Sequence, residues 1–133
     1  ELMTKCVENV YSAFATPSQY AALVAFDKGM EAMMAMKKEY KKRRDFLVSR
    51  INEMDKISCI MPKGAFYVFA NIKQTGLSEE EFAERLLEKE HVAVIPGSNF
   101  SKNASGYVRI SYGTSMEKIE DGLNRMERFL KSL

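Results

Sequence analysis

The sequence predicts an α+β domain of two layers, in which helices cover one face of a small mixed or antiparallel sheet. One long stretch repeats its apolar residues at three- and four-residue spacing, as an amphipathic helix does. Two later stretches begin with the Ser/Thr-x-x-Glu pattern of a helix N-terminus. Four short β-prone runs lie between these three helical stretches, at residues 57–61, 65–70, 91–95 and 107–112.

Length and composition limit the possible classes of protein. The 133 residues suit one domain, so we expect a single domain over residues 1–133. An apolar content of 46% excludes a disordered chain. No apolar stretch approaches the ~20 residues that span a bilayer, and the N-terminus resembles no secretion signal. Cys6 and Cys59 form no CxxC pair. We therefore expect a cytoplasmic location and no membrane partner.

The first sixteen residues end at the break Ala15-Thr16-Pro17. Since proline suits the first turn of a helix, we expect Thr16 to be an N-cap. The chain starts at Glu1 rather than at Met, which suggests a piece of a longer protein. We expect residues 1–16 to be an interdomain segment, and the chain to self-associate through apolar surface meant for the missing neighbour.

Residues 18–54 form one long helix or two consecutive ones, with a kink expected near Gly29. Their methionines are interpreted as core packing. The apolar residues that recur at helical spacing are Leu23, Phe26, Met30, Met33, Met34, Leu47, Ile51 and Met54.

The runs at residues 57–61 and 65–70 are expected to be neighbouring strands joined by a tight turn at Pro62-Lys63-Gly64. Here Gly64 would let the backbone come close to a neighbour. The capping box Ser78-Glu79-Glu80-Glu81 opens a second helix, with Glu81 reaching back to the cap. Its apolar stripe is Phe82, Ala83, Leu86 and Leu87.

Residues 91–95 are a predicted strand that begins with His91, the single histidine. No second ligand lies at metal-binding spacing around it, so we expect no metal site. The following loop, residues 96–106, contains Gly97, which permits backbone angles closed to other residues. It ends a strand, a common place for binding residues, although on its own such a segment is more often an ordinary connection.

The last strand, residues 107–112, precedes a final helix opened by Thr114-Ser115-Met116-Glu117. Alternation places Arg109 on the face opposite Val108 and Ile110. A strand arginine is most often solvated, but its planar fork also suits a carboxylate ligand.

Six cations lie within residues 37–45, which admits a nucleic-acid-binding module as one alternative. On a helix, however, they spread around the circumference, and acidic residues interrupt them. With a net charge of only +2, we expect a solvated face and no nucleic-acid partner.

Three segments in order resemble the C-terminal small domain of class I and II pyridoxal-phosphate (PLP) aminotransferases, the aspartate aminotransferase-like fold. They read P-K-G-A-F-Y at residues 62–67, V-A-V-I-P-G-S-N-F at residues 92–100 and G-Y-V-R-I-S-Y at residues 106–112. The stretch Gln19-Tyr20-Ala21-Ala22 is also similar to that family, so the resemblance covers nearly the whole chain.

The resemblance implies that Arg109 binds the α-carboxylate of an amino-acid substrate. It places Gly64, Phe66, Gly97 and Phe100 as support positions near the mouth of the active site. It implies PLP as the cofactor of the full-length protein, an amino acid and a 2-oxo acid as substrates, and a homodimer. The Schiff-base lysine and other cofactor ligands belong to the large domain upstream, so we expect this chain alone to bind no PLP and to be inactive.

Two alternatives share the fold. A PLP-dependent carbon–sulfur lyase would release ammonia or a thiol, whereas a transaminase releases only the keto acid. A transcription regulator with an aminotransferase-like sensor domain would carry a winged-helix segment upstream.

Overall fold

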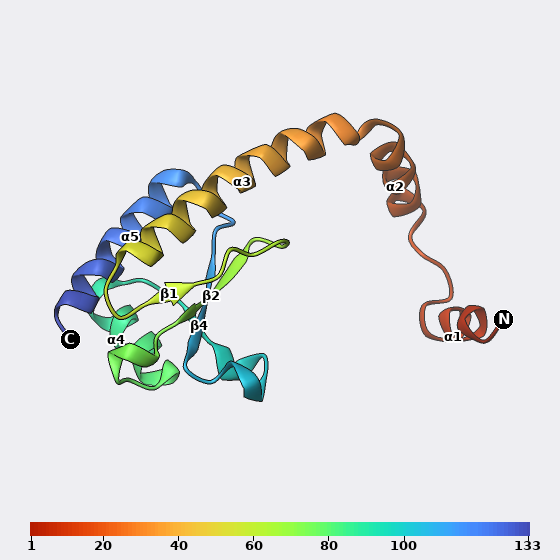
Figure 1. Ribbon diagram of the computed structural model, residues 1–133. Coiled ribbons are helices and arrows are strands. Elements are labelled where there is room, and N and C mark those ends of the chain that lie inside the picture. The colour runs from red at the N-terminus through yellow and green to blue at the C-terminus, as the bar shows by residue number, and fades with distance from the viewer. The chain divides into compact units, whose positions relative to one another are not determined.

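The computed structural model describes residues 1–133 except for the side chain of Tyr11, and it divides into two compact units, Glu1–Lys38 and Glu39–Leu133 (Figure 1). The organised core belongs to the second unit. The expectation of a single domain over the whole chain stays a prediction, as does the interdomain role of residues 1–16.

The first unit consists of helices α1 (Leu2–Tyr11) and α2 (Thr16–Lys28) and the start of α3 (Met30–Glu53). Sequence periodicity did not predict α1. The expected cap at Thr16 is wrong: Ala15 is the N-cap, and no side chain caps the helix. The expected break near Gly29 is confirmed, since Gly29 caps α2 and its N–H donates to the Ala25 carbonyl at 2.9 Å.

Helix α2 buries none of its residues. The interpretation of the methionines as core packing is wrong for Met30, Met33, Met34 and Met36, which are 48–63% exposed, and is confirmed for Met54, which is 7% exposed. Phe26 is 90% exposed, and Leu23 and Val24 are more than half exposed. Periodicity indicates which residues share a helix face, but it does not show that a neighbour covers that face.

We expect this apolar surface to make the 133-residue chain self-associate, because contiguous exposed apolar area is normally covered by a partner. The weight-average sedimentation coefficient should rise with protein concentration. A variant with Leu23, Val24 and Phe26 all replaced by serine should show a smaller rise. A purely monomeric profile of the unaltered chain at high concentration would contradict the prediction.

The second unit contains a four-stranded sheet in the order β1-β2-β4-β3, antiparallel throughout. Its strands are β1 (Ser58–Cys59), β2 (Tyr67–Asn71), β3 (Ile95–Pro96) and β4 (Tyr107–Ser111). The antiparallel form of the predicted sheet is therefore confirmed.

Two strand expectations are wrong in detail. The strands β1 and β2 pair as expected, but residues 60–66 join them in place of a tight turn. The strand expected at residues 91–95 contains only Ile95, which pairs in β3, because His91 takes the left-handed conformation (φ 56°) as the C-cap of the preceding helix. Val92 and Val94 pack against the core without joining the sheet.

Helices α4 (Glu79–Glu90) and α5 (Met116–Lys131) follow β2 and β4. Ser78 caps α4 as expected, since its Oγ accepts from the Glu81 N–H at 3.2 Å. The Glu81 carboxylate pairs with Arg85 at 2.6 Å instead of reaching back to the cap. Only the Ser78 half of the expected capping box is therefore formed. The cap of α5 is Ser115, one residue later than the pattern Thr114-x-x-Glu117 predicted.

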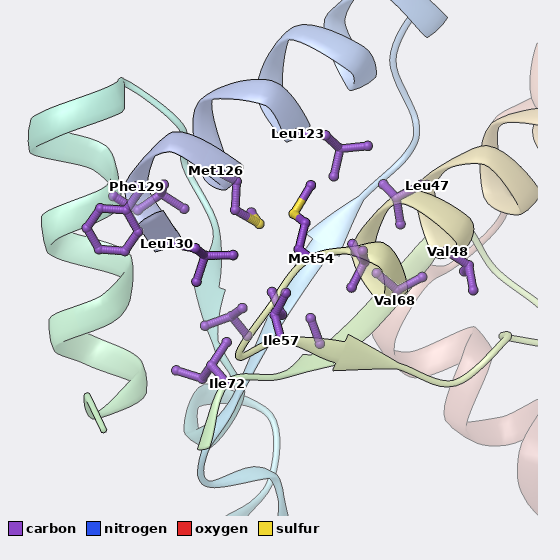
Figure 2. Packing of buried hydrophobic residues seen from close by; sticks show 14 of the residues in the cluster. Leu47, Val48, Met54, Ile57, Val68, Ile72, Leu123, Met126, Phe129 and Leu130 are labelled. Atoms are coloured by element: carbon purple, nitrogen blue, oxygen red, sulfur yellow. The ribbon is translucent and has the colours of Figure 1, made fainter. Parts of the chain in front are cut away.

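The helices α3, α4 and α5 cover one face of this sheet, as predicted. Helices α3 and α5 lie side by side (Figure 1), and Arg50 donates to Asn124 at 3.0 Å and to Glu127 at 3.1 Å. Figure 2 shows Leu47 and Val48 from α3, Val68 from β2, and Leu123 and Met126 from α5 in one cluster.

Alternation along β2 and β4 separates the two faces of the sheet. The core face carries Val68, Ala70 and Val108, each at most 1% exposed. Each fully buried large aliphatic or aromatic side chain contributes about 1.5–3 kcal/mol. The opposite face carries Phe69, which is 39% exposed, and Arg109. This second face has no covering helix within the second unit and is where a ligand can reach the sheet.

Candidate carboxylate-binding site

Arg109 lies in the middle of β4, opposite Phe69 of β2 and Ile95 of β3. Its neighbour Val108 is fully buried, and Ile110 packs against the core. Since successive strand residues point to opposite faces, the Arg109 side chain lies on the uncovered face. The prediction that Arg109 lies on the face opposite Val108 and Ile110 is confirmed.

Two aromatic rings contact the Arg109 guanidinium. Its central carbon lies 4.3 Å from the Tyr67 ring centroid and 4.1 Å from that of Phe100. Phe100 in turn meets Phe69 edge to face at 5.8 Å. Each cation–π contact is worth about 0.5–2 kcal/mol and restricts the long arginine side chain. The rings therefore hold the guanidinium through its face, which leaves its edge donors available.

No described carboxylate forms an ion pair with Arg109, and no described acceptor bonds its side chain. Most other arginines of the second unit form ion pairs, among them Arg44 with Asp45 at 2.7 Å and Arg128 with Glu90 at 2.8 Å, whereas Arg43 lies over the Tyr40 ring at 5.4 Å and pairs with no described carboxylate. An aromatic-braced guanidinium with open donors is suited to bind a carboxylate through two parallel hydrogen bonds.

Phe100 belongs to the loop between β3 and β4, which contains the 3₁₀ turns η2 (Gly97–Asn99) and η3 (Lys102–Ala104). Its N–H donates to the Gly97 carbonyl at 2.9 Å. A Cβ at Gly97 would collide with the Ala104 carbonyl oxygen and would lie 2.8 Å from that of Tyr107. The expectation of an unusual backbone angle at Gly97 is wrong, since φ is not positive there; close backbone approach is what requires glycine.

Glu79 anchors the far end of the same loop, a role that sequence reasoning missed. Only 5% exposed, it is the one charged residue counted as buried in the described part of the chain, and its Oε2 accepts from the Gly106 N–H at 2.9 Å. The sequence identifies Glu79 only as one of three acidic residues in the first turn of a helix. Nothing local distinguishes it from its exposed neighbour Glu80.

The hydrogen bond from the Gly106 N–H is the largest cause that holds the pKa of the Glu79 carboxyl below its ordinary value of 4.5, against the opposing effect of burial. A depressed pKa means that folding favours the charged form. This contribution to stability is therefore present above pH 4.5 and is lost as the pH falls through the folded-state pKa.

Phe66 joins the site indirectly. Its ring lies 4.5 Å from Tyr67, which contacts Arg109, and stacks on Tyr40 at 5.9 Å. Gly64 is not brought to this network: a Cβ there would meet nothing within 4 Å. The close backbone approach expected at Gly64 is therefore wrong within this chain.

A groove of about 400 Å³ adjoins the arginine on the uncovered face, sharing Tyr67 and Phe69 as walls. Cys59 also lines it, and burial raises the pKa of the Cys59 thiol to about 11. The unfolded thiol would titrate near 9, so the folded environment suppresses the reactive thiolate.

We expect iodoacetamide at pH 8 to modify the exposed Cys6 at least tenfold faster than Cys59, because only the thiolate reacts. Peptide mass spectrometry after timed quenching measures both rates in one sample. In denaturant the two rates should converge. Equal rates in the native protein would contradict the prediction.

Three of the six cations in the basic run on α3 form ion pairs within their own helix. Lys41 bonds Asp45 at 2.7 Å, Lys42 bonds Glu39 at 2.7 Å, and Arg44 shares Asp45. This pairing is consistent with the expected solvated face. No group of three potential metal ligands occurs among the described residues, and no described helix has the length and apolar character to cross a membrane.

Fold and site together define an α+β domain with an aromatic-braced arginine on its open sheet face. The family model for aminotransferase class I and II matches residues 1–126. The chain therefore belongs to the class I and II aminotransferases, which are PLP-dependent as a family.

Known relatives match most of this chain, but the match covers only part of the relatives' own length. The chain is 47% identical over 131 residues to an aspartate aminotransferase of Pyrococcus horikoshii, covering 97% of this chain and 34% of that protein. It matches the crystal structure of an aromatic aminotransferase from Pyrococcus horikoshii OT3 with a TM-score of 0.82 and 47% identity, over 86% of this chain and 31% of that one.

A third comparison is the aspartate aminotransferase from Rhizobium meliloti, with a TM-score of 0.89 and 29% identity over 97% of this chain and 34% of that one. The chain thus spans about a third of the length of its relatives.

Proposed function

We propose that this chain is the small domain of a PLP-dependent aminotransferase, in which Arg109 binds the α-carboxylate of the amino-acid substrate. The full-length protein would transfer an amino group from an amino acid to a 2-oxo acid. The observation that supports this is the Arg109 guanidinium, braced by Tyr67 and Phe100 and left without a described carboxylate partner.

The residues of the site have distinct roles in this proposal. Arg109 supplies charge and two parallel donors, so it fixes both the position and the direction of a carboxylate. Tyr67 and Phe100 restrict the guanidinium before the substrate arrives, which reduces the entropy lost on binding. Phe66 contacts Tyr67 and Tyr40, and so supports the Tyr67 ring that braces the guanidinium.

The donor set of this chain does not fit PLP itself. The open face of β2 and β4 carries Tyr67, Phe69, Asn71, Tyr107, Arg109 and Ser111. These strand residues include neither a lysine amine for a Schiff base nor a carboxylate for a pyridinium nitrogen, both of which PLP chemistry requires, and the nearby Lys73 ammonium lies over the Tyr107 ring at 5.2 Å. We therefore assign cofactor binding to the rest of the full-length protein.

The proposal includes two partners. The rest of the same polypeptide would cover the open face and the apolar surface of α2, and a second full-length copy would complete a homodimer. Closure of this domain over the substrate would expel water from the Arg109 site.

The test is the Arg109→Ala variant of the full-length holoenzyme. We expect a large loss of kcat/KM for the amino acid with unchanged PLP absorbance. Unaltered kcat/KM would reject the proposed role of Arg109.

A further inference from the structure

We propose that Glu79 is a positioning residue for the carboxylate clamp, acting through the loop of residues 97–106 that holds Phe100 against Arg109. This inference rests on the proposed function, since it concerns how Arg109 is prepared for its substrate. It assigns a functional role to a side chain that lies on another element and does not touch the arginine.

The argument begins with the burial of Glu79. Removing a carboxylate from water is costly unless hydrogen bonds satisfy it, so buried acids are uncommon. Glu79 is 5% exposed and accepts from the Gly106 N–H at 2.9 Å. Hydrogen bonds to a charged group are about twice as strong as those between neutral groups. The bond therefore fixes Gly106 more firmly than a neutral acceptor would.

The second step is the position of Gly106, at the point where the loop enters β4. Its carbonyl accepts from the Ile72 N–H at 3.0 Å, and its φ of 78° is one that glycine adopts without strain. Both polar groups of this one residue are thus held, from α4 on one side and from the end of β2 on the other. Glu79 supplies half of that anchor.

The third step connects the anchor to Phe100. The start of the loop is held at Gly97, which packs against the backbone of Ala104 and Tyr107. Ser98 Oγ donates to Glu80 Oε1 at 2.9 Å, a second bond from α4 to the loop. With both ends held, the loop presents the Phe100 ring 4.1 Å from the Arg109 guanidinium and 5.8 Å from Phe69.

Loss of the Glu79 bond would release the Gly106 end and let the Phe100 ring move. The guanidinium would then sample more rotamers, and the substrate carboxylate would have to order them on binding. The expected signature is weaker substrate binding with little change in the chemical step. A role in global stability alone would alter the folded fraction without changing KM.

The experiment compares Glu79→Ala and Glu79→Gln in the full-length holoenzyme, with Glu84→Gln as the matched control. Glu84 lies on the same helix, and its side chain is exposed. Steady-state rates are measured with L-aspartate and with L-phenylalanine as amino donors. For the donor that is used, we expect Glu79→Ala to raise KM about tenfold and to change kcat less than threefold. Glu79→Gln should raise KM less, because it keeps one acceptor, and Glu84→Gln should leave both constants unchanged.

A double-mutant cycle with Phe100→Ala tests the route of the effect. If Glu79 acts through Phe100, the double variant should have nearly the KM of Phe100→Ala alone. Additive effects on KM, or an unchanged KM in both Glu79 variants, would overturn the inference. If Glu79→Ala does not fold, the cycle is completed with Glu79→Gln.

Failure of this inference is distinguishable from failure of the proposed function. If Arg109→Ala raises KM but the Glu79 variants do not, Arg109 remains the clamp and only the positioning role is rejected. If Arg109→Ala itself leaves KM and kcat/KM unchanged, the proposed function fails, whatever Glu79 does.

Discussion

Replacing Arg109 by alanine in the full-length protein is expected to lower kcat/KM for the amino-acid substrate by about a hundredfold or more. Truncating one partner of a desolvated, hydrogen-bonded charge pair costs about 2–5 kcal/mol, and each 1.4 kcal/mol is a factor of ten. The variant should still fold, because the Arg109 side chain lies on the uncovered face and not in the core cluster. The measurement is steady-state kinetics, with PLP absorbance recorded on the same samples.

Two further variants test whether the loss of kcat/KM depends on the paired donors of Arg109 and is specific to this arginine. Arg109→Lys keeps the charge but lacks the planar fork, so it should recover only part of the activity. Arg128→Ala removes an exposed arginine that pairs with Glu90 at the surface, and it should leave kcat/KM unchanged. Full activity of Arg109→Lys would show that charge alone is needed and that paired donors are not.

Gly97→Ala is expected to destabilise the second unit by about 1–3 kcal/mol, the range typical when atoms are forced into a packed region. The added methyl would collide with the Ala104 carbonyl oxygen and would lie 2.8 Å from that of Tyr107. Both are backbone atoms, so no side-chain rotation relieves the overlap. Thermal unfolding of the 133-residue chain should show a Tm lower by about 10 °C.

Gly64→Ala is the matched control. Its added methyl would meet nothing within 4 Å, and the φ of Gly64 is not positive. Alanine there should change stability by less than about 1 kcal/mol, with a small gain expected because the unfolded chain loses entropy. Similar Tm values for the two variants would refute the close approach at Gly97.

Local patterns predicted the elements of the second unit well, since each depends on nearby residues. Alternation in residues 107–112 placed Val108 inside and Arg109 outside, and the structure agrees. The caps show the limit of such patterns. Ser78 was predicted correctly, but the α5 cap moved from Thr114 to Ser115, because adjacent hydroxyl residues fit the same pattern.

Similar limits explain the other misses. The strand expected at residues 91–95 was β-prone, but a left-handed cap at His91 turned the chain before it could pair. Gly64 and Gly97 look alike as glycines in turn-rich segments. Only the positions of Ala104 and Tyr107 reveal which of the two has no room for a side chain.

An α+β domain with an arginine on the open face of its sheet could be predicted from the residues alone, because periodicity and alternation are properties of neighbouring residues. Its motifs also indicated the aminotransferase family. The surroundings of Arg109 become known only in the folded protein: the Tyr67 and Phe100 rings, the lack of a described carboxylate partner, and the Glu79 anchor behind the loop. Those contacts join residues far apart in the chain, and the packing of separate elements sets their distances.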